Sequence, residues 1–137
     1  MITEDYVSFD TAKLLKEKGF DICCEFQYIN CLSGHPFLTD IRDDAGCYYK
    51  NSEIGQDEYS APTLQMAMKW LREVHNILVS PYALRPGYYF EIFDLTNRDI
   101  SGCKPLYKVG IPRNEDVLNT YEEACEAAIK YCLENLI

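Results

Sequence analysis

The sequence lacks the long apolar run that a membrane span requires. No stretch of its 137 residues approaches the roughly 18 apolar residues needed to cross a bilayer. The first residues, Met1 to Asp5, are acidic, whereas a secretory signal begins with basic residues followed by apolar ones. We therefore expect a cytoplasmic protein that does not associate with a membrane.

Glycine and proline are also scarce, with seven and six residues, while 47% of the chain is hydrophobic and 13% is aromatic. This composition is too apolar for a disordered segment. A chain of this length buries about two-thirds of its unfolded surface on folding. We therefore expect a single folded domain that covers residues 1–137.

Basic residues are few, since 13 of them face 22 acidic residues and the net charge is −9. The acids gather at Asp40 to Glu58 and at Glu115 to Glu134. Nucleic-acid binding needs a cationic surface against the phosphate backbone, and the chain also lacks a glycine-rich phosphate loop, a dinucleotide fingerprint and a nucleophile elbow. We expect no direct binding to nucleic acid and no cofactor.

Seven cysteines are present, and in a cytoplasmic protein they are expected to be reduced thiols. The ligand types of a zinc site gather within one part of the chain, at Cys23, Cys24, Cys31, His35 and Cys47. Structural zinc sites usually take two ligands from a knuckle two to four residues long, and this cluster has no such spacing. We expect buried thiols and no metal.

Three further residues are of types that act in catalysis, namely two cysteines and a histidine. Cys125 and Cys132 share one helical face, but seven residues separate them by about 10 Å, which is too far for a disulfide. Neither has a basic neighbour in sequence that would lower its pKa, so both are expected to be core thiols. His75 falls at a helix C-terminus on an apolar stripe, which favours a structural histidine over a general base.

Periodicity and capping signals predict a two-layer α+β fold with an antiparallel sheet. The predicted elements are helices at about 9–18, 61–76 and 121–136, a strand at 22–29 and a meander of three to four strands over 77–109. Ser8, Ser60 and Thr120 are the expected N-caps, and Gly19 ends the first helix. Residues 30–60 are expected to form an irregular acidic excursion with one strand-like piece at Cys47–Lys50.

The helix at 61–76 has the widest apolar arc in the chain. Its two adjoining stripes are Leu64, Ala67, Met68, Leu71 and His75, and Met66, Trp70 and Val74. An arc wider than a surface helix needs predicts a central core helix. Trp70 is therefore expected to be buried, and its replacement to be among the most damaging single changes.

Three stretches carry a resemblance to a known group of proteins. They are residues 12–21 (AKLLKEKGFD), 59–73 (YSAPTLQMAMKWLRE) and 121–137 (YEEACEAAIKYCLENLI). Together they resemble small proteins carried by prophages and mobile elements of gut Bacteroidetes bacteria. The resemblance implies a phage-related genetic context, and it implies no activity, cofactor or site residue.

The sequence offers one candidate contact site for a partner protein. Eleven tyrosines are more than one core of this size should absorb, so some rings must reach the surface. Tyr48 and Tyr49 lie in the acidic segment beside Asp43 and Asp44, and tyrosines inside a charged rim are typical of protein interfaces. The leading hypothesis is a non-enzymatic accessory or protein-interaction protein of a mobile element. The same rings could instead cover a sheet edge or fill a satellite core beneath the loop.

Two alternatives remain open at the level of sequence. The first is a small-molecule-binding protein or enzyme with a pocket under residues 30–60, where His35, Asp40, Asp43 and Asp44 could line it. The second is an acidic mimic of nucleic acid that occupies a basic protein groove. From the helix at 61–76 onward, the predicted order α-β-β-β-α also matches that of double-stranded RNA-binding domains. In this chain, however, Glu122 and Glu123 stand where such domains use lysines.

Overall fold

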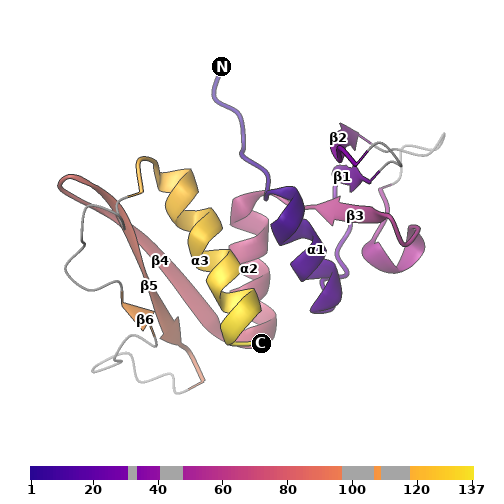
Figure 1. The fold of residues 1–137 in the computed structure, drawn as a ribbon. Coiled ribbons are helices and arrows are strands. Elements are labelled where there is room, and N and C mark those ends of the chain that lie inside the picture. The colour runs from indigo at the N-terminus through magenta and orange to yellow at the C-terminus, as the bar shows by residue number, and fades with distance from the viewer. Residues whose placement is uncertain (31–33, 41–47, 97–106, 109–117) are drawn as a thin grey trace. The chain divides into compact units, whose positions relative to one another are not determined.

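The computed structural model describes residues 1–30, 34–40, 48–96, 107–108 and 118–137 (Figure 1). The chain divides into two compact units, Met1–Thr63 and Leu64–Ile137. The expectation of a single domain stays a prediction. Within the described residues, no helix combines the length and the apolarity that crossing a bilayer requires.

The predicted α+β class is confirmed. The three helices are α1 (Phe9–Glu17), α2 (Leu64–His75) and α3 (Tyr121–Asn135), and a short 3-10 helix, η1, covers Asn51–Glu53. The strands are β1 (Phe26–Ile29), β2 (Phe37–Asp40), β3 (Glu58–Ala61), β4 (Ile77–Leu84), β5 (Gly87–Asp94) and β6 (Tyr107–Lys108). In the described part of the chain they form two antiparallel sheets, β2-β1-β3 and β4-β5-β6.

Helix α1 of the first unit has the two ends that the sequence predicts. The Ser8 hydroxyl accepts a hydrogen bond from the Thr11 N–H, which satisfies one of the free donors of the first turn. Gly19 follows the helix with a φ of 87°, a left-handed conformation that glycine adopts without steric cost. The turn directs Phe20 inward, where its side chain is fully buried.

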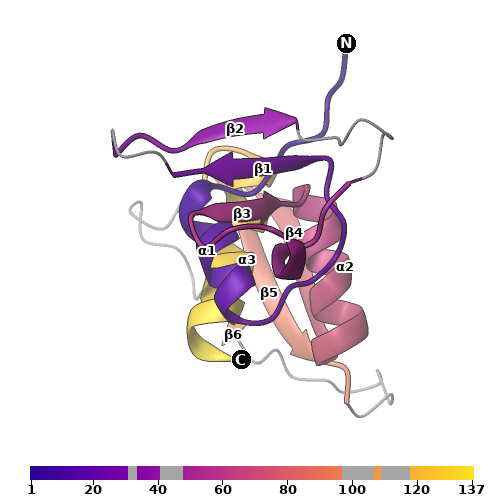
Figure 2. The same cartoon turned by 90° about the vertical axis from the view of Figure 1, so that its right-hand side faces the viewer.

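Helix α1 packs against the first sheet through aromatic contacts. The ring of Phe9 meets those of Tyr28 and Tyr59 edge-on, at centroid distances of 5.7 and 5.5 Å. Figure 2 shows β2, β1 and β3 in that order, with β2 on the outside of the sheet. The Tyr28 hydroxyl donates to the Val7 carbonyl at 2.8 Å, which ties the segment before α1 to the central strand.

The acidic excursion contains more regular structure than the sequence predicts. Two strands lie in it, β2 and β3. Of the expected strand-like piece, residues 48–50 are described, and Tyr49 forms an isolated bridge with Cys24. Ser60 belongs to β3 and does not cap α2, which begins at Leu64 instead of near residue 61. Ser60 and Ala61, which resemble the start of a helix in sequence, pair with β1 as part of β3 instead. The predicted strand at 22–29 is shorter and begins at Phe26.

The second unit contains the predicted hairpin, in which Leu84 pairs with Gly87 across the expected turn. Helices α2 and α3 pack against β4 and β5 (Figure 1). The core includes Tyr89 and Ile92 of β5 together with Ile129 of α3, all at most 1% exposed. Pro81 lies in β4, the edge strand of this sheet, as expected for a residue without a backbone N–H.

The apolar arc of α2 is narrower than predicted. Trp70 is 5% exposed and belongs to the core, as expected, whereas Val74 is 57% exposed.

Helix α3 begins as predicted, because the Thr120 hydroxyl accepts a hydrogen bond from the Glu123 N–H at 3.1 Å. Its buried face contains both cysteines, Cys125 and Cys132.

Candidate functional site

The first sheet has two edges, and side chains of the first unit close one of them. At the outer edge of β3, the Ser60 N–H donates to the Asn51 side-chain oxygen at 2.9 Å. The Glu58 carbonyl at the same edge accepts a hydrogen bond from the Lys16 ammonium at 2.7 Å. Because these groups are already satisfied, the β3 edge cannot pair with a further strand without losing them.

Asn51 and Lys16 are held in place by further contacts. The Asn51 amide donates to the Phe20 carbonyl at 2.7 Å, and its side chain is 6% exposed. The Lys16 ammonium also donates to the Gly55 carbonyl at 2.7 Å and lies 5.2 Å from the centre of the Tyr59 ring. Burial lowers the pKa of Lys16, although nearby carboxylates favour its charged form. Both residues thus connect the α1 region to residues 51–60.

Strand β1 fixes which backbone groups of β2 point outward. The Asn30 N–H, directly after β1, donates to the Asp57 carbonyl on the β3 side. Since backbone groups alternate along an antiparallel strand, Gln27 and Ile29 direct their N–H and carbonyl groups toward β2. Their partners there are Thr39 and Phe37.

Strand β2 therefore presents Leu38 and Asp40 at the outer edge of the sheet. Their N–H and carbonyl groups point away from β1, and no described strand pairs with that edge. A weak contact joins the Thr39 hydroxyl to the Asp40 carbonyl at 3.4 Å. The Phe37 and Leu38 side chains are 48% and 38% exposed. This open edge, the β2 edge, is the feature of the first unit best suited to bind an extended chain.

Negative charge is concentrated in the same unit. Residues 1–63 carry 12 acidic and 5 basic residues, a net charge of −7, whereas residues 64–137 carry 10 and 8, a net charge of −2. Near the Asp40 end of β2, burial raises the pKa of the Tyr6 hydroxyl, and the carboxylates of Glu25, Glu4 and Asp40 raise it further. Three carboxylates, of which Asp40 belongs to β2, therefore act on the same tyrosine.

The contact site predicted from sequence is described only in part. Tyr48 and Tyr49 are half-buried, and the Tyr49 carbonyl accepts a hydrogen bond from the Cys24 N–H at 3.4 Å. Asp43 and Asp44 lie outside the described residues. The bridge to Cys24 places Tyr49 beside the start of β1. That the two tyrosine rings contact a partner protein stays a hypothesis.

The cysteines near the start of the first sheet are in different environments. Cys23 is exposed, whereas Cys24 is buried and burial raises the pKa of its thiol to about 12. His35 is exposed in the loop before β2, and Cys31 and Cys47 lie outside the described residues. Over the described ranges, no group of three metal-ligating side chains comes together.

The two cysteines of α3 are buried thiols. Burial raises the pKa of Cys125 to about 11 and that of Cys132 to about 12. A thiol with such a pKa is protonated at neutral pH, and the nucleophile is the thiolate. These residues therefore pack in the core and are poor nucleophiles.

His75 packs against Trp70 of the same helix, with ring centroids 4.5 Å apart in an edge-on arrangement. Burial lowers its pKa, so the neutral imidazole is favoured and not the protonated form expected at a helix C-terminus. Its Nε2 is buried and has no hydrogen-bond partner among the described residues. Among the described residues, no carboxylate is hydrogen-bonded to that nitrogen to orient it as a general base.

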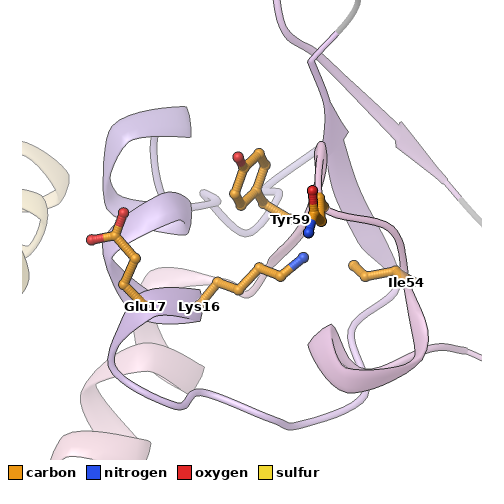
Figure 3. A pocket seen from close by; sticks show the side chains of 5 residues that line it. Lys16, Glu17, Ile54 and Tyr59 are labelled. Atoms are coloured by element: carbon orange, nitrogen blue, oxygen red, sulfur yellow. The ribbon is translucent and has the colours of Figure 1, made fainter.

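A cavity of about 370 Å³ lies in the first unit beside residues 54–59 (Figure 3). It is lined by Lys16, Glu17, Ile54, Gln56 and Tyr59. In Figure 3 the Lys16 side chain extends toward Ile54 and Tyr59, while Glu17 points away. Neither His35 nor Asp40, which the sequence suggested for a pocket in this region, lines it.

The open β2 edge, Asn51 and Lys16 were not identified from the sequence. Their role depends on backbone direction and on which edge is covered, and neither follows from side-chain type. The best sequence signal for the β2 edge is Pro36, because proline commonly precedes or begins an edge strand.

Comparison with known proteins adds no assignment, since no protein-family model, curated protein or solved structure matches this chain.

Proposed function

We propose that this chain is a non-enzymatic protein-interaction protein whose first unit binds a basic partner protein. The observation that carries the proposal is the coincidence of a net charge of −7 in residues 1–63 with the open β2 edge of the same unit. Opposite charge steers association and favours the correct partner. The resemblance described above suggests that this partner belongs to a mobile element or to its host cell.

The chemistry of the described residues supports binding over catalysis. The buried thiols Cys24, Cys125 and Cys132 have raised pKa values. His75 is packed against Trp70, and its Nε2 has no hydrogen-bond partner among the described residues. Exposed apolar side chains next to carboxylates, as at Leu38 and Asp40, are the usual parts of an interface with a charged rim.

The test is a binding measurement with charge-matched variants. A partner is first captured by the intact protein from a Bacteroidetes host lysate and purified. The double variant Glu25→Gln with Asp57→Asn removes two charges from the first unit, and Glu73→Gln with Glu134→Gln removes two from the second. We expect the first variant to weaken binding several-fold at about 50 mM salt and much less at about 300 mM, and the second to change it little.

The same assay includes Tyr48→Ala and Tyr49→Ala, each checked first for unchanged thermal stability. A loss of affinity in a folded variant would extend the contact site to these rings. Equal effects of the two charge variants, or binding that is independent of salt, would refute the proposed role of the first unit.

The cavity beside residues 54–59 supports a second candidate, a small-molecule-binding protein. Its volume of about 370 Å³ is within the range of ligand pockets, and the Tyr59 ring and Ile54 offer apolar contacts. An NMR screen of small neutral and zwitterionic compounds tests this candidate. Ligands of the cavity would shift the Ile54 and Tyr59 signals, and Tyr59→Ala would abolish the shifts.

A further inference from the structure

We propose that the β2 edge binds an extended basic segment of the partner protein as an additional strand of the first sheet. This inference rests on the proposed function and specifies how the first unit makes its contact. Strand addition uses backbone hydrogen bonds for affinity and side chains for specificity, and Leu38 of β2 offers both, through its outward backbone groups and its exposed side chain.

The backbone argument starts from the contrast between edges. At the β3 edge, Asn51 accepts a hydrogen bond from the Ser60 N–H, and Lys16 donates one to the Glu58 carbonyl. At the β2 edge, the outward groups of Leu38 have no partner in the described part of the chain. Natural proteins usually protect such an edge with proline, lysine or a covering segment.

The second unit shows one of these protections. Its edge strand β4 contains Pro81 near the middle, and this residue has no N–H to donate to an added strand. Strand β2, Phe37–Asp40, has neither proline nor lysine within it. The β2 edge is therefore more open to strand addition than the β3 edge or the β4 edge.

The negative charge of the first unit determines which kind of segment fits the β2 edge. A second copy of this chain would bring another unit of net charge −7 and another Asp40 to the same edge, and like charges opposite each other destabilise strand pairing. A segment rich in lysine or arginine would instead meet Asp40 and the nearby Glu25. We therefore expect a basic partner segment and not self-association.

Side-chain alternation defines the pattern of that segment. Phe37 and Leu38 are neighbours in β2, so they project to opposite faces of the sheet, and both are exposed. An added strand would place side chains next to each of them. An extended segment that mixes apolar and basic residues therefore fits this edge better than a uniformly charged one.

The probe is a fluorescently labelled octapeptide of alternating lysine and valine, and its affinity for the intact protein is measured by anisotropy. Its control is the fully backbone N-methylated peptide, which keeps every side chain and charge but has no N–H to donate. We expect the unmodified peptide to bind with salt-dependent affinity, and the N-methylated peptide to bind at least about tenfold more weakly.

Two variants of the protein test the edge directly. Leu38→Pro removes an outward N–H, and the bonds between β2 and β1 remain because they involve Phe37 and Thr39. Leu38→Ala keeps the N–H and removes most of the side chain. Circular dichroism verifies that both are folded. We expect Leu38→Pro to lower the affinity at least about tenfold and Leu38→Ala less than about threefold.

The outcomes separate this inference from the proposed function. If both peptides bind equally well and Leu38→Pro binds normally, the first unit attracts basic chains by charge alone, and strand addition is wrong. If Leu38→Pro is unfolded, β2 needs the Leu38 N–H internally and the open edge does not exist. If neither peptide binds at about millimolar concentration, both proposals fail. A dimer abolished by Leu38→Pro would identify a second copy as the occupant.

Discussion

Asn51 is the side chain whose loss should cost the first unit most for its size. It donates to the Phe20 carbonyl at 2.7 Å and accepts from the Ser60 N–H at 2.9 Å, in a site where it is only 6% exposed. The substitution Asn51→Ala would remove both of these hydrogen bonds. A buried backbone group that loses a hydrogen-bond partner costs about 1–3 kcal/mol, so the free energy of unfolding should fall by about 2–6 kcal/mol.

A loss of this size is a large part of the about 5–15 kcal/mol that stabilises a typical domain. The measurement is urea unfolding followed by far-UV circular dichroism, together with hydrogen exchange of the Ser60 amide. That amide should exchange much faster in the variant, because its acceptor is gone. If water enters the site, the fall in the free energy of unfolding should be near the lower end of the range of about 2–6 kcal/mol.

Ser52→Ala is the matched control, because Ser52 is the next residue of η1 and is exposed. Its hydroxyl and N–H both bond the Asp21 carboxylate, each at 2.9 Å. The substitution removes only the hydroxyl bond, so it should cost under about 1 kcal/mol, as is usual for surface positions. If Asn51→Ala were no more destabilising than Ser52→Ala, or if the Ser60 amide stayed protected, the reasoning would be refuted.

Two further predictions concern the core and the thiols. Trp70→Ala should destabilise the protein by about 3–5 kcal/mol, because Trp70 is 5% exposed and packs on His75; in thermal unfolding, an effect no larger than that of the exposed control Val74→Ala would contradict this. Iodoacetamide at neutral pH should modify Cys23 faster than Cys24, Cys125 or Cys132, whose pKa values burial raises to about 12, 11 and 12. Peptide mass spectrometry checks the order of modification, and equal rates would show that these thiols are accessible.

Local signals were sufficient to predict several parts of the fold. Ser8, Gly19 and Thr120 mark helix ends through the geometry of a single turn, which depends little on the rest of the molecule. The hairpin at Arg85–Gly87 also follows from its turn residues. These elements are encoded within a few residues, so the sequence is enough to identify them.

Elements that depend on distant partners were predicted less well. Ser60 has the local pattern of a helix cap, yet its segment pairs with β1, and the gain from that pairing decides its conformation. Strand β2 lacks an alternating pattern because, at a sheet edge, its Phe37 and Leu38 side chains are both exposed. Neither outcome can be derived without knowing which strands meet.

The candidate site shows the same limit. Reasoning from residue types led to Tyr48 and Tyr49, and their role in binding stays untested. The β2 edge depends on backbone groups, which every residue type carries. Only the pairing of β1 with β2 and β3 shows that Leu38 faces outward while Ser60 is covered.

The start and the end of the first unit lie next to each other. Tyr6 forms an antiparallel bridge with Thr63, and the Val7 N–H donates to the Pro62 carbonyl at 3.1 Å. A short linker could therefore join these two points, and new termini could be opened at an exposed loop elsewhere in residues 1–63. Neighbouring chain ends are the property that makes circular permutation and domain insertion tolerated. The first unit thus has the geometry of an insertable module.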